Sequence, residues 1–126
     1  MRLLLDTCTL IWILTGERPI PGRARSEIAL REVLVSAASA WEIAIKSSKG
    51  TLRLPDAPDR LLPAARARYG FDSLAIDEES ALHITKLPPL HADPFDRMLV
   101  SQAIVHGLTI VTPDPLVTQY PARTLW

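Results

Sequence analysis

The chain has 126 residues, of which 48% are hydrophobic and 22% are charged. These proportions are typical of a folded domain with a sizeable core, and they exclude the disordered and fibrous classes. Because 14 basic residues balance 14 acidic ones, the net charge indicates neither nucleic acid nor a membrane as a partner. It does not exclude nucleic acid, since basic patches and bound cations act locally.

The sequence has a single cysteine, Cys8, so an internal disulfide is excluded. It shows neither a signal peptide nor a long apolar span, and we therefore expect a cytoplasmic protein that does not enter a membrane. Because no histidine stands near Cys8 in a triad-like context, we expect this residue to be a small buried packing residue rather than a nucleophile. No repeat or linker divides the chain, which predicts one domain over residues 1–126.

The beginning of the chain predicts a strand followed by an apolar helix. The run Leu3–Leu5 has the composition of a buried central strand, and it ends at an acid, Asp6. Residues 10–14 then indicate a short helix that is apolar on more faces than one packing surface needs, so part of it is expected to contact another chain. A linker at 19–22 precedes a helix over 23–31.

Residues 33–35 predict a second buried strand, and Ser36 is a good N-cap for a helix that runs from Ala37 to about Lys49. Glu42 lies in the second turn of this helix, beside an expected apolar stripe. Taken alone, this segment favours an ordinary surface ion pair between Glu42 and Lys46. The expected stripe comprises Ala37, Ala40, Trp41, Ala44 and Ile45.

The second half of the chain continues the alternation of helices and strands. A helix is expected over 59–69, where Pro63 must sit in the first turn or break the helix in two. The other expected elements are a strand over 71–76, a helix from an Asp77 cap to about Lys86, a strand over 108–111 and a short edge strand over 123–126.

The stretch 91–104 contains two acids at the start of an otherwise apolar helix. Asp93 and Pro94 form an N-cap and a first helical residue, which places Asp96 in the first turn near the positive end of the helix dipole. The helix is apolar on too many sides for a surface helix, so we expect it to be largely buried and to end at Gly107. Taken alone, the two acids are explained by capping, in which Asp93 accepts the backbone N–H of Asp96.

Helices that alternate with apolar strands indicate an α/β fold whose parallel sheet is covered on both faces. In such folds ligands bind outside the carboxyl ends of the strands, where Asp6, Glu42, Asp96 and Asp114 are all expected. Clustered carboxylates repel one another unless a cation neutralises them. Oxygen ligands without His or Cys at ligand spacing suit Mg²⁺ or Mn²⁺, and these cations serve phosphodiester hydrolysis.

The chain resembles the PIN-domain ribonucleases and, among them, the VapC toxins of toxin–antitoxin pairs. The resemblance extends over nearly the whole chain, and the order and spacing of its pieces make it specific. It implies a three-layer α/β/α fold with a central parallel sheet of four to five strands, Mg²⁺- or Mn²⁺-dependent endoribonuclease activity on RNA, a homodimer, and a cognate VapB-like antitoxin that joins it in a higher assembly. The matching pieces are residues 3–7 (LLLDT), 35–46 (VSAASAWEIAIK), 93–97 (DPFDR), Gln102-Ala103 and 110–114 (IVTPD).

Carried over by position, the resemblance assigns four acids to a catalytic and metal-binding site. It implies that Asp6 and Asp96 bind the metal directly and that Glu42 does so directly or through water. Asp114 is expected to bind metal only when substrate is present. The accessory residues implied in the same way are Asp93, Thr112 and Thr7.

Two positions depart from the family pattern, namely Cys8, where a polar residue or His is frequent, and Pro113, where Arg or Asn is common. These departures concern substrate contacts rather than the metal site. Lys46 and Arg97 are expected to contact phosphate or, more simply, to form salt bridges. We expect structural or surface roles for His83, His91 and His106, and core or interface positions for Trp12, Trp41 and Trp126.

Two other functions are also compatible with the sequence. One is a catalytically idle member of the family that works by binding RNA or an antitoxin. The other is a metal-dependent nuclease that cuts DNA, because no residue can be assigned to the ribose 2′-OH. The sequence argues against a receiver domain, which needs paired acids after its first strand, and against a haloacid-dehalogenase-type phosphatase, which needs an acid where Cys8 stands.

Overall fold

All five strands lie in one parallel sheet in the computed structural model, which describes residues 1–126. The spatial order is β3-β2-β1-β4-β5, so the chain starts in the middle of the sheet and extends it first to one side and then to the other. This confirms the predicted α/β fold with a parallel sheet of four to five strands. The strands are β1 (Arg2–Leu5), β2 (Glu32–Ser36), β3 (Asp72–Leu74), β4 (Thr109–Val111) and β5 (Thr124–Leu125).

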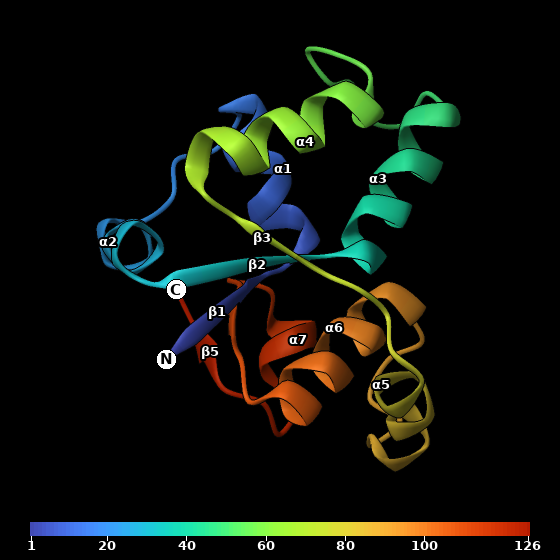
Figure 1. Ribbon diagram of the computed structural model, residues 1–126. Helices are drawn as coiled ribbons and strands as arrows, with labels where there is room; N and C mark the ends of the chain where they lie inside the picture. Colours follow the sequence, from blue (N-terminus) through green and yellow to red (C-terminus); the bar gives the residue numbers. More distant parts are fainter.

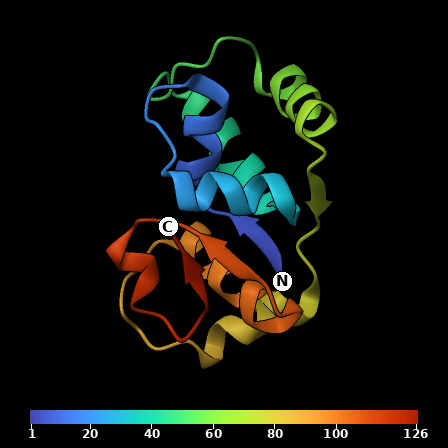
Figure 2. The same cartoon turned by 90° about the vertical axis from the view of Figure 1, so that its left-hand side faces the viewer.

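Helices cover both faces of the sheet, as the alternation predicted. In Figure 1, α1 and α4 lie above the strands and α5, α6 and α7 lie below them. Figure 2, after a 90° turn, shows that α2 belongs to the upper layer. No helix is both long enough and apolar enough to span a bilayer. The helices are α1 (Thr7–Thr15), α2 (Gly22–Leu30), α3 (Ala37–Ser48), α4 (Pro58–Tyr69), α5 (Glu78–His83), α6 (Pro94–His106) and α7 (Pro115–Thr118), with a 3₁₀ turn at Ile84–Lys86.

The core consists of two hydrophobic clusters, one on each face of the sheet. Alternate residues of a strand point to opposite faces, so Leu3 and Leu5 lie in the cluster that includes α1, α2 and α4, while Leu4 lies in the cluster that α6 closes. The helix α3 contributes to both, through Ile43 on one side and Ala38 on the other. Its rotation about its own axis is therefore fixed by both clusters.

Side chains cap the helices that follow β1, β2 and β4 directly. The Asp6 carboxylate accepts the Thr9 N–H at the start of α1, and Ser36 accepts the Ala38 N–H at the start of α3. Asp114 caps α7 in the same way. The predicted Ser36 cap is confirmed. Because parallel strands end at one edge of a sheet, these capping residues gather there.

Two details of the predicted elements are wrong. The helix α4 continues unbroken through Pro63, because the ring removes one backbone hydrogen bond while Leu62 and Ala65 anchor the helix in the core. The third strand ends at Leu74 rather than at residue 76. The carbonyl of Ala75 instead accepts a hydrogen bond from Gln102 Nε2 at 3.0 Å, which takes the chain out of the sheet.

Candidate active site

Asp6 follows the central strand and is 2% exposed. Its Oδ1 accepts the backbone N–H of Thr9 at 2.8 Å, so the carboxylate is held at the first turn of α1. Burial raises the pKa of Asp6, hydrogen bonds from Thr112 and Thr9 oppose that effect, and the charge of Asp114 adds to the rise. The predicted site residue Asp6 is therefore a buried carboxylate next to a second acid.

Glu42 lies on the buried face of α3 and is 5% exposed. The expected apolar stripe is wrong, because Trp41 is 59% exposed and the buried face instead carries Ala38, Glu42 and Ile43. Lys46 Nζ donates to Glu42 Oε2 at 2.6 Å, as the local pattern favoured. The other oxygen, Oε1, is buried and has no hydrogen-bond partner. A solvated surface ion pair does not describe this contact, since half of the carboxylate is desolvated and unsatisfied.

The start of α6 has the predicted cap. Asp93 Oδ1 accepts the backbone N–H groups of Phe95 at 2.9 Å and Asp96 at 3.0 Å. The αL residue Gly107 ends the helix where expected. Burial raises the pKa of Asp96 to about 6, a hydrogen bond from His91 opposes the rise, and the charges of Asp93, Glu42 and Asp114 add to it. The electrostatic influence of these acids on Asp96 indicates that they lie in one region.

Asp114 and Thr112 follow β4. Asp114 Oδ1 accepts the Leu116 N–H at 2.9 Å, and the Asp114 N–H donates to Thr112 Oγ1 at 3.0 Å. Thr112 is 1% exposed and also hydrogen-bonds Asp6. It therefore links the carboxylate after β1 with the turn that carries the acid after β4.

Cys8 lies close enough to all four acids for their charges to affect its thiol. It is exposed, so the expectation of a buried packing residue is wrong. Partial desolvation raises the pKa of its thiol to about 11, and the charges of Asp6, Asp96, Asp114 and Glu42 add to that rise. The first turn of α1 points Cys8 outward because Thr7 and Thr9 occupy its buried side. The thiol consequently faces solvent in a region of negative charge, which disfavours a thiolate nucleophile.

Thr7 joins two of the site-bearing helices. Its Oγ1 donates to Ser39 Oγ at 3.0 Å, and both residues are buried. This contact links the first turn of α1 to the first turn of α3. The accessory residue Thr7 thus has a structural contact with α3.

The fold does not bring three ligating side chains together into a ready-made metal site. The donor chemistry nevertheless fits a hard divalent cation, because the four acids of the site supply carboxylate oxygens and one of these, Glu42 Oε1, is buried without a partner. A cation at this place would also offset the charge repulsion that raises the pKa of Asp96. Asp6, Glu42, Asp96 and Asp114 are the residues that would hold it.

His91 is a site residue that sequence reasoning missed. Its Nε2 lies 3.1 Å from Asp96 Oδ2 and its Nδ1 lies 2.7 Å from the hydroxyl of Tyr120. The expectation of a purely structural or surface role did not anticipate this contact with a candidate metal ligand. The one signal in the sequence was that His91 precedes Asp96 by only five residues, with a loop and the Asp93 cap between them.

Arg97 forms no ion pair, contrary to the expectation of a salt bridge. Its guanidinium donates to the carbonyls of Pro88 at 2.9 Å and Ile84 at 3.3 Å and to the Tyr120 hydroxyl at 3.1 Å. These bonds occupy the side chain in the packing of the loop before α6, so a phosphate contact from Arg97 is not supported.

A hollow of about 410 Å³ opens beside the acids, between the end of α3 and the start of α6. Lys46 and Lys49 lie in its lining together with Glu42 and Phe95. The exposed Trp41 ring packs edge-on against Phe95, with centroids 5.1 Å apart. Because Trp41 is 59% exposed, the core position expected for it is wrong, and the interface position stays a prediction. Two lysine ammonium groups therefore lie next to a cluster of carboxylates. This arrangement suits a charged, extended ligand.

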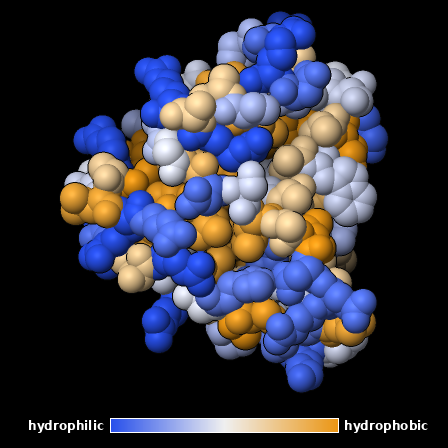
Figure 3. All heavy atoms as spheres, in the orientation of Figure 1, coloured by the Kyte–Doolittle hydropathy of each residue, from blue (hydrophilic) through white to orange (hydrophobic).

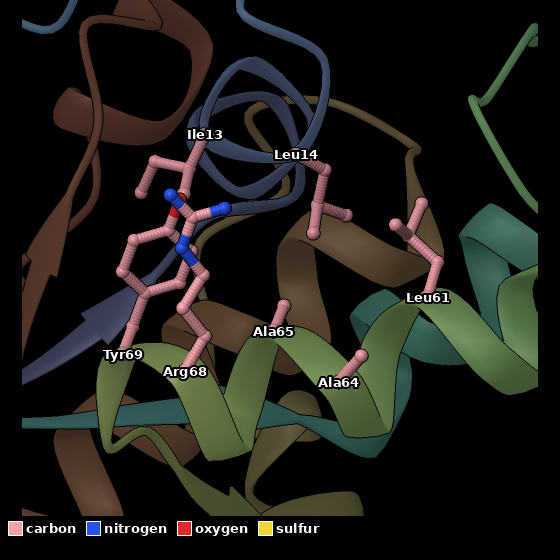
Figure 4. Close-up of a pocket in the computed structure, with 7 residues that line it drawn as sticks. All are labelled: Ile13, Leu14, Leu61, Ala64, Ala65, Arg68 and Tyr69. Carbon is pink, nitrogen blue, oxygen red and sulfur yellow. The ribbon is translucent and has the colours of Figure 1, made fainter.

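A second, apolar surface lies between α1, α2 and α4. Ile13 and Tyr69 line both a hollow of about 140 Å³ against α4, drawn in Figure 4, and one of about 410 Å³ against α2. Figure 3 shows apolar atoms gathered on this face, between α4 and α2. Nearby, Trp12 packs against Trp126 with centroids 5.8 Å apart. The prediction that the first helix has more apolar surface than one packing face needs is consistent with these hollows.

The histidine at the far end of α6 has a different environment from His91. His106 Nε2 lies 2.9 Å from Asp77 Oδ1, and Asp77 caps α5 by accepting the Ser80 N–H at 3.0 Å. This contact confirms the expected structural role of His106 and the predicted Asp77 cap. It ties α5 to α6 on the lower layer.

The comparisons with known proteins agree with the fold. A chain in the crystal structure of VapBC2 from Rickettsia felis bound to a DNA fragment from their promoter has a TM-score of 0.75 at 15% identity, over 99% of this chain and 98% of that one. A chain in DNA-bound VapBC from Salmonella typhimurium has 0.70 at 21% identity, over 99% and 97%. A chain in FitAcB from Neisseria gonorrhoeae has 0.62 at 19% identity, over 98% and 96%.

These structural similarities show a shared fold. No curated protein sequence matches the chain. The family model of the PIN domain, however, matches residues 3–121, which include all four acids of the site. Since that match extends over nearly the whole chain, this protein belongs to the PIN-domain family.

Proposed function

We propose that this PIN domain is a VapC-type toxin, an endoribonuclease that depends on Mg²⁺ or Mn²⁺ and hydrolyses RNA phosphodiester bonds at Asp6, Glu42, Asp96 and Asp114. The observation that carries the proposal is the buried, unpartnered Oε1 of Glu42, in a region that also contains Asp6 and Asp96, whose pKa values are raised by burial. A buried carboxylate oxygen without a partner costs stability, and a bound cation would remove that cost.

Each acid has a distinct setting in this proposal. When bound, Mg²⁺ or Mn²⁺ supplies the positive charge that phosphodiester hydrolysis requires. Thr9 and Thr112 hold Asp6 in place, and His91 holds Asp96. Glu42 keeps one oxygen on Lys46 and has the other free to orient an attacking water. Asp114 is partly buried at the turn after β4, where it can contribute to the site once substrate is present.

The hollow beside the acids supports a substrate with a phosphate backbone. Lys46 and Lys49 line it, and Lys49 forms no ion pair within the chain. If the scissile phosphate of an RNA strand lies at the carboxylates, the rest of the RNA would therefore pass two ammonium groups. Trp41 stands exposed at the edge of this path, where an indole can stack on an unpaired base.

The test is a cleavage assay on the purified, partner-free protein. Total RNA and single-stranded DNA are incubated with Mg²⁺, with EDTA, and with the Asp96→Asn variant. We expect cleavage of RNA with Mg²⁺ alone. Cleavage that survives EDTA or the substitution would contradict the mechanism, cutting of DNA alone would identify a deoxyribonuclease, and RNA binding without cutting would identify a catalytically idle member.

We further propose that the apolar surface between α1, α2 and α4 receives a VapB-like antitoxin. Its hollows are lined by Ile13, Tyr69 and neighbouring apolar side chains, with Arg25, Arg31 and Arg68 in their lining as well. An amphipathic segment with acidic flanks would complement this surface. The support from known structures is that the similar chains were crystallised as parts of VapBC and FitAcB assemblies.

Co-expression with a VapB-like protein tests the partner proposal. Tyr69→Glu is expected to abolish co-purification, while Leu82→Glu, on the exposed side of α5, leaves it intact. Light scattering of the isolated chain tests the proposed homodimer in the same preparations. Unchanged co-purification of the Tyr69 variant would place the partner on another surface.

A further inference from the structure

A chain of hydrogen bonds leads from backbone carbonyls to the carboxylate of Asp96. Arg97 donates to the carbonyls of Pro88 and Ile84 and, through Nη1, to the Tyr120 hydroxyl at 3.1 Å. That hydroxyl lies 2.7 Å from His91 Nδ1, and His91 Nε2 lies 3.1 Å from Asp96 Oδ2. These hydrogen bonds connect α6, the loop before it and the segment after α7.

The donors along this chain determine where the imidazole proton lies. A guanidinium can only donate, so the Tyr120 oxygen accepts from Arg97. Tyr120 is 3% exposed, and the acceptor within reach of its own hydroxyl proton is His91 Nδ1. A buried hydroxyl proton is costly to leave unpaired, so Nδ1 accepts it. The neutral imidazole then carries its proton on Nε2 and donates it to Asp96 Oδ2.

This arrangement makes the two oxygens of Asp96 unequal. Oδ2 is engaged by His91, whereas Oδ1 forms no hydrogen bond. The His91 and Asp96 side chains are 11% and 18% exposed, so their contact is largely shielded from solvent. The Tyr120 and His91 rings pack against each other at an interplanar angle of 55°, with centroids 5.4 Å apart, and this contact limits rotation of the imidazole. The carboxylate is thereby held in one orientation with one oxygen free.

We propose that His91 is a positioning residue that, with its proton fixed on Nε2 by Tyr120 and Arg97, holds Asp96 so that Oδ1 is free to bind the divalent cation. This inference rests on the proposed function, because it concerns the cation that the acids would hold. Hydrogen bonds to a ligating carboxylate fix its orientation, and their loss typically weakens metal binding about 10- to 100-fold.

The first measurement is the Mn²⁺ dissociation constant at pH 8, from the paramagnetic resonance of free Mn²⁺. We expect His91→Leu to raise this constant at least about 10-fold. His91→Gln, whose amide can donate to Asp96, should recover much of the affinity. Tyr120→Phe should give an intermediate loss, since the imidazole proton is then free to move to Nδ1. In turnover, kcat should fall with each loss while the KM for RNA stays nearly constant.

His106→Leu is the matched control. It breaks a histidine–aspartate contact of similar length, to Asp77, at the other end of the same helix. We expect it to lower the Tm and to leave the Mn²⁺ constant unchanged. If His91→Leu behaves in the same way, His91 is a structural residue and the inference is wrong. If the wild-type chain binds Mn²⁺ normally and only the His91 comparison fails, the proposed function stands; if the wild type binds no Mn²⁺, both fail.

A second measurement examines the proton itself in the metal-free protein. The ¹⁵N shifts of an imidazole distinguish a proton on Nε2 from one on Nδ1. We expect the Nε2–H form for His91 in the wild type and a mixture in Tyr120→Phe. A wild-type spectrum with the proton on Nδ1 would overturn the assignment, whatever the metal measurements show.

Discussion

Lys46 Nζ lies 2.6 Å from Glu42 Oε2, and this contact leaves Oε1 of the same carboxylate buried without a partner. The ion pair therefore satisfies half of Glu42 and leaves the other half available for chemistry. A helix that needed only stability would gain from an apolar residue at this buried position. Glu42 is better explained by a use for its second oxygen.

Replacing Glu42 by Gln keeps the side-chain volume and removes the charge. We expect a loss of at least about 100-fold in kcat/KM for RNA, comparable to removing one electrostatic group from an active site. The free energy of unfolding of the metal-free protein should change by less than about 1 kcal/mol, because a costly buried charge and its ion pair are lost together. The rise in Tm on adding Mn²⁺ should disappear.

The matched control for Glu42→Gln is Glu27→Gln. Glu27 pairs with Arg31 four residues later at 2.8 Å, on the more exposed helix α2. This variant should keep full activity and the full Mn²⁺ response. Normal activity in Glu42→Gln, measured beside this control, would remove Glu42 from the site.

Asp96 should make the stability of the metal-free protein depend on pH. Its pKa is raised from 3.8 to about 6, mainly by burial. The folded state therefore binds the proton more tightly than the unfolded chain does, so the associated stability is fully present below pH 3.8 and is lost as the pH rises through 6. In EDTA, the Tm should therefore fall between about pH 4 and pH 6 and level off above pH 6.

The variant Asp96→Asn separates this contribution from the others. In this variant the Tm should fall less steeply with pH over the same interval. The remaining fall is due to Asp6, whose pKa is raised too. Thermal unfolding followed by circular dichroism at half-unit pH steps gives both curves. Identical slopes for wild type and variant would mean that Asp96 does not carry a raised pKa.

Asp77 should produce a pH dependence of the opposite sign. Hydrogen bonds from His106 and Ser80 hold its pKa well below 3.8. Its stabilising effect is therefore present above the ordinary pKa and is lost as the pH falls below that value. Asp77→Ala should lower the Tm at pH 7, with a difference from wild type that narrows steadily as the solution is acidified below pH 4.

Asp72→Ala provides the reference for that comparison, because Asp72 is exposed on β3 and forms neither a hydrogen bond through its carboxylate nor an ion pair. Asp72→Ala should leave the Tm nearly unchanged both at pH 7 and below pH 4. A difference between Asp77→Ala and wild type that stays constant down to pH 2 would show that capping by backbone contacts, and not charge, accounts for the effect.

Lys49 should contribute to RNA binding through the hollow beside the acids. We expect Lys49→Ala to raise the KM about 3-fold at low salt with kcat retained, and to reduce the slope of log KM against log[salt] by the equivalent of about one phosphate contact. Lys86→Ala, in the 3₁₀ turn on the lower layer, should change neither quantity. Equal effects of the two substitutions would show that the hollow is not the path of the strand.

Several features follow from residues that are neighbours in sequence. The Asp93-Pro94 start of α6, its end at Gly107, and the caps at Ser36 and Asp77 were predictable because each depends on hydrogen bonds that close within a turn. The alternation of apolar strands with helices predicted the parallel sheet, because parallel strands need helical connections between them. The strand order β3-β2-β1-β4-β5 was not predicted and is known only from the structure.

Other features were decided only by contacts between distant segments. The face of α3 that is buried carries Glu42 rather than Trp41, because two clusters on opposite sides of the sheet fix the rotation of a helix rich in small residues. Cys8 faces solvent because its two neighbours point inward. Thr7 donates a hydrogen bond to Ser39, and Thr9 donates one to the carbonyl of Val111.

The same holds for the surroundings of Asp96. The sequence determined that an acid stands in the first turn of α6, since a cap and a proline specify that turn locally. Only the tertiary structure decided that Tyr120, 29 residues after His91, orients the imidazole toward that acid. Periodicity records which residues are apolar and carries no information about such pairings, because the hydrogen bonds that fix them form only when distant parts of the chain pack together.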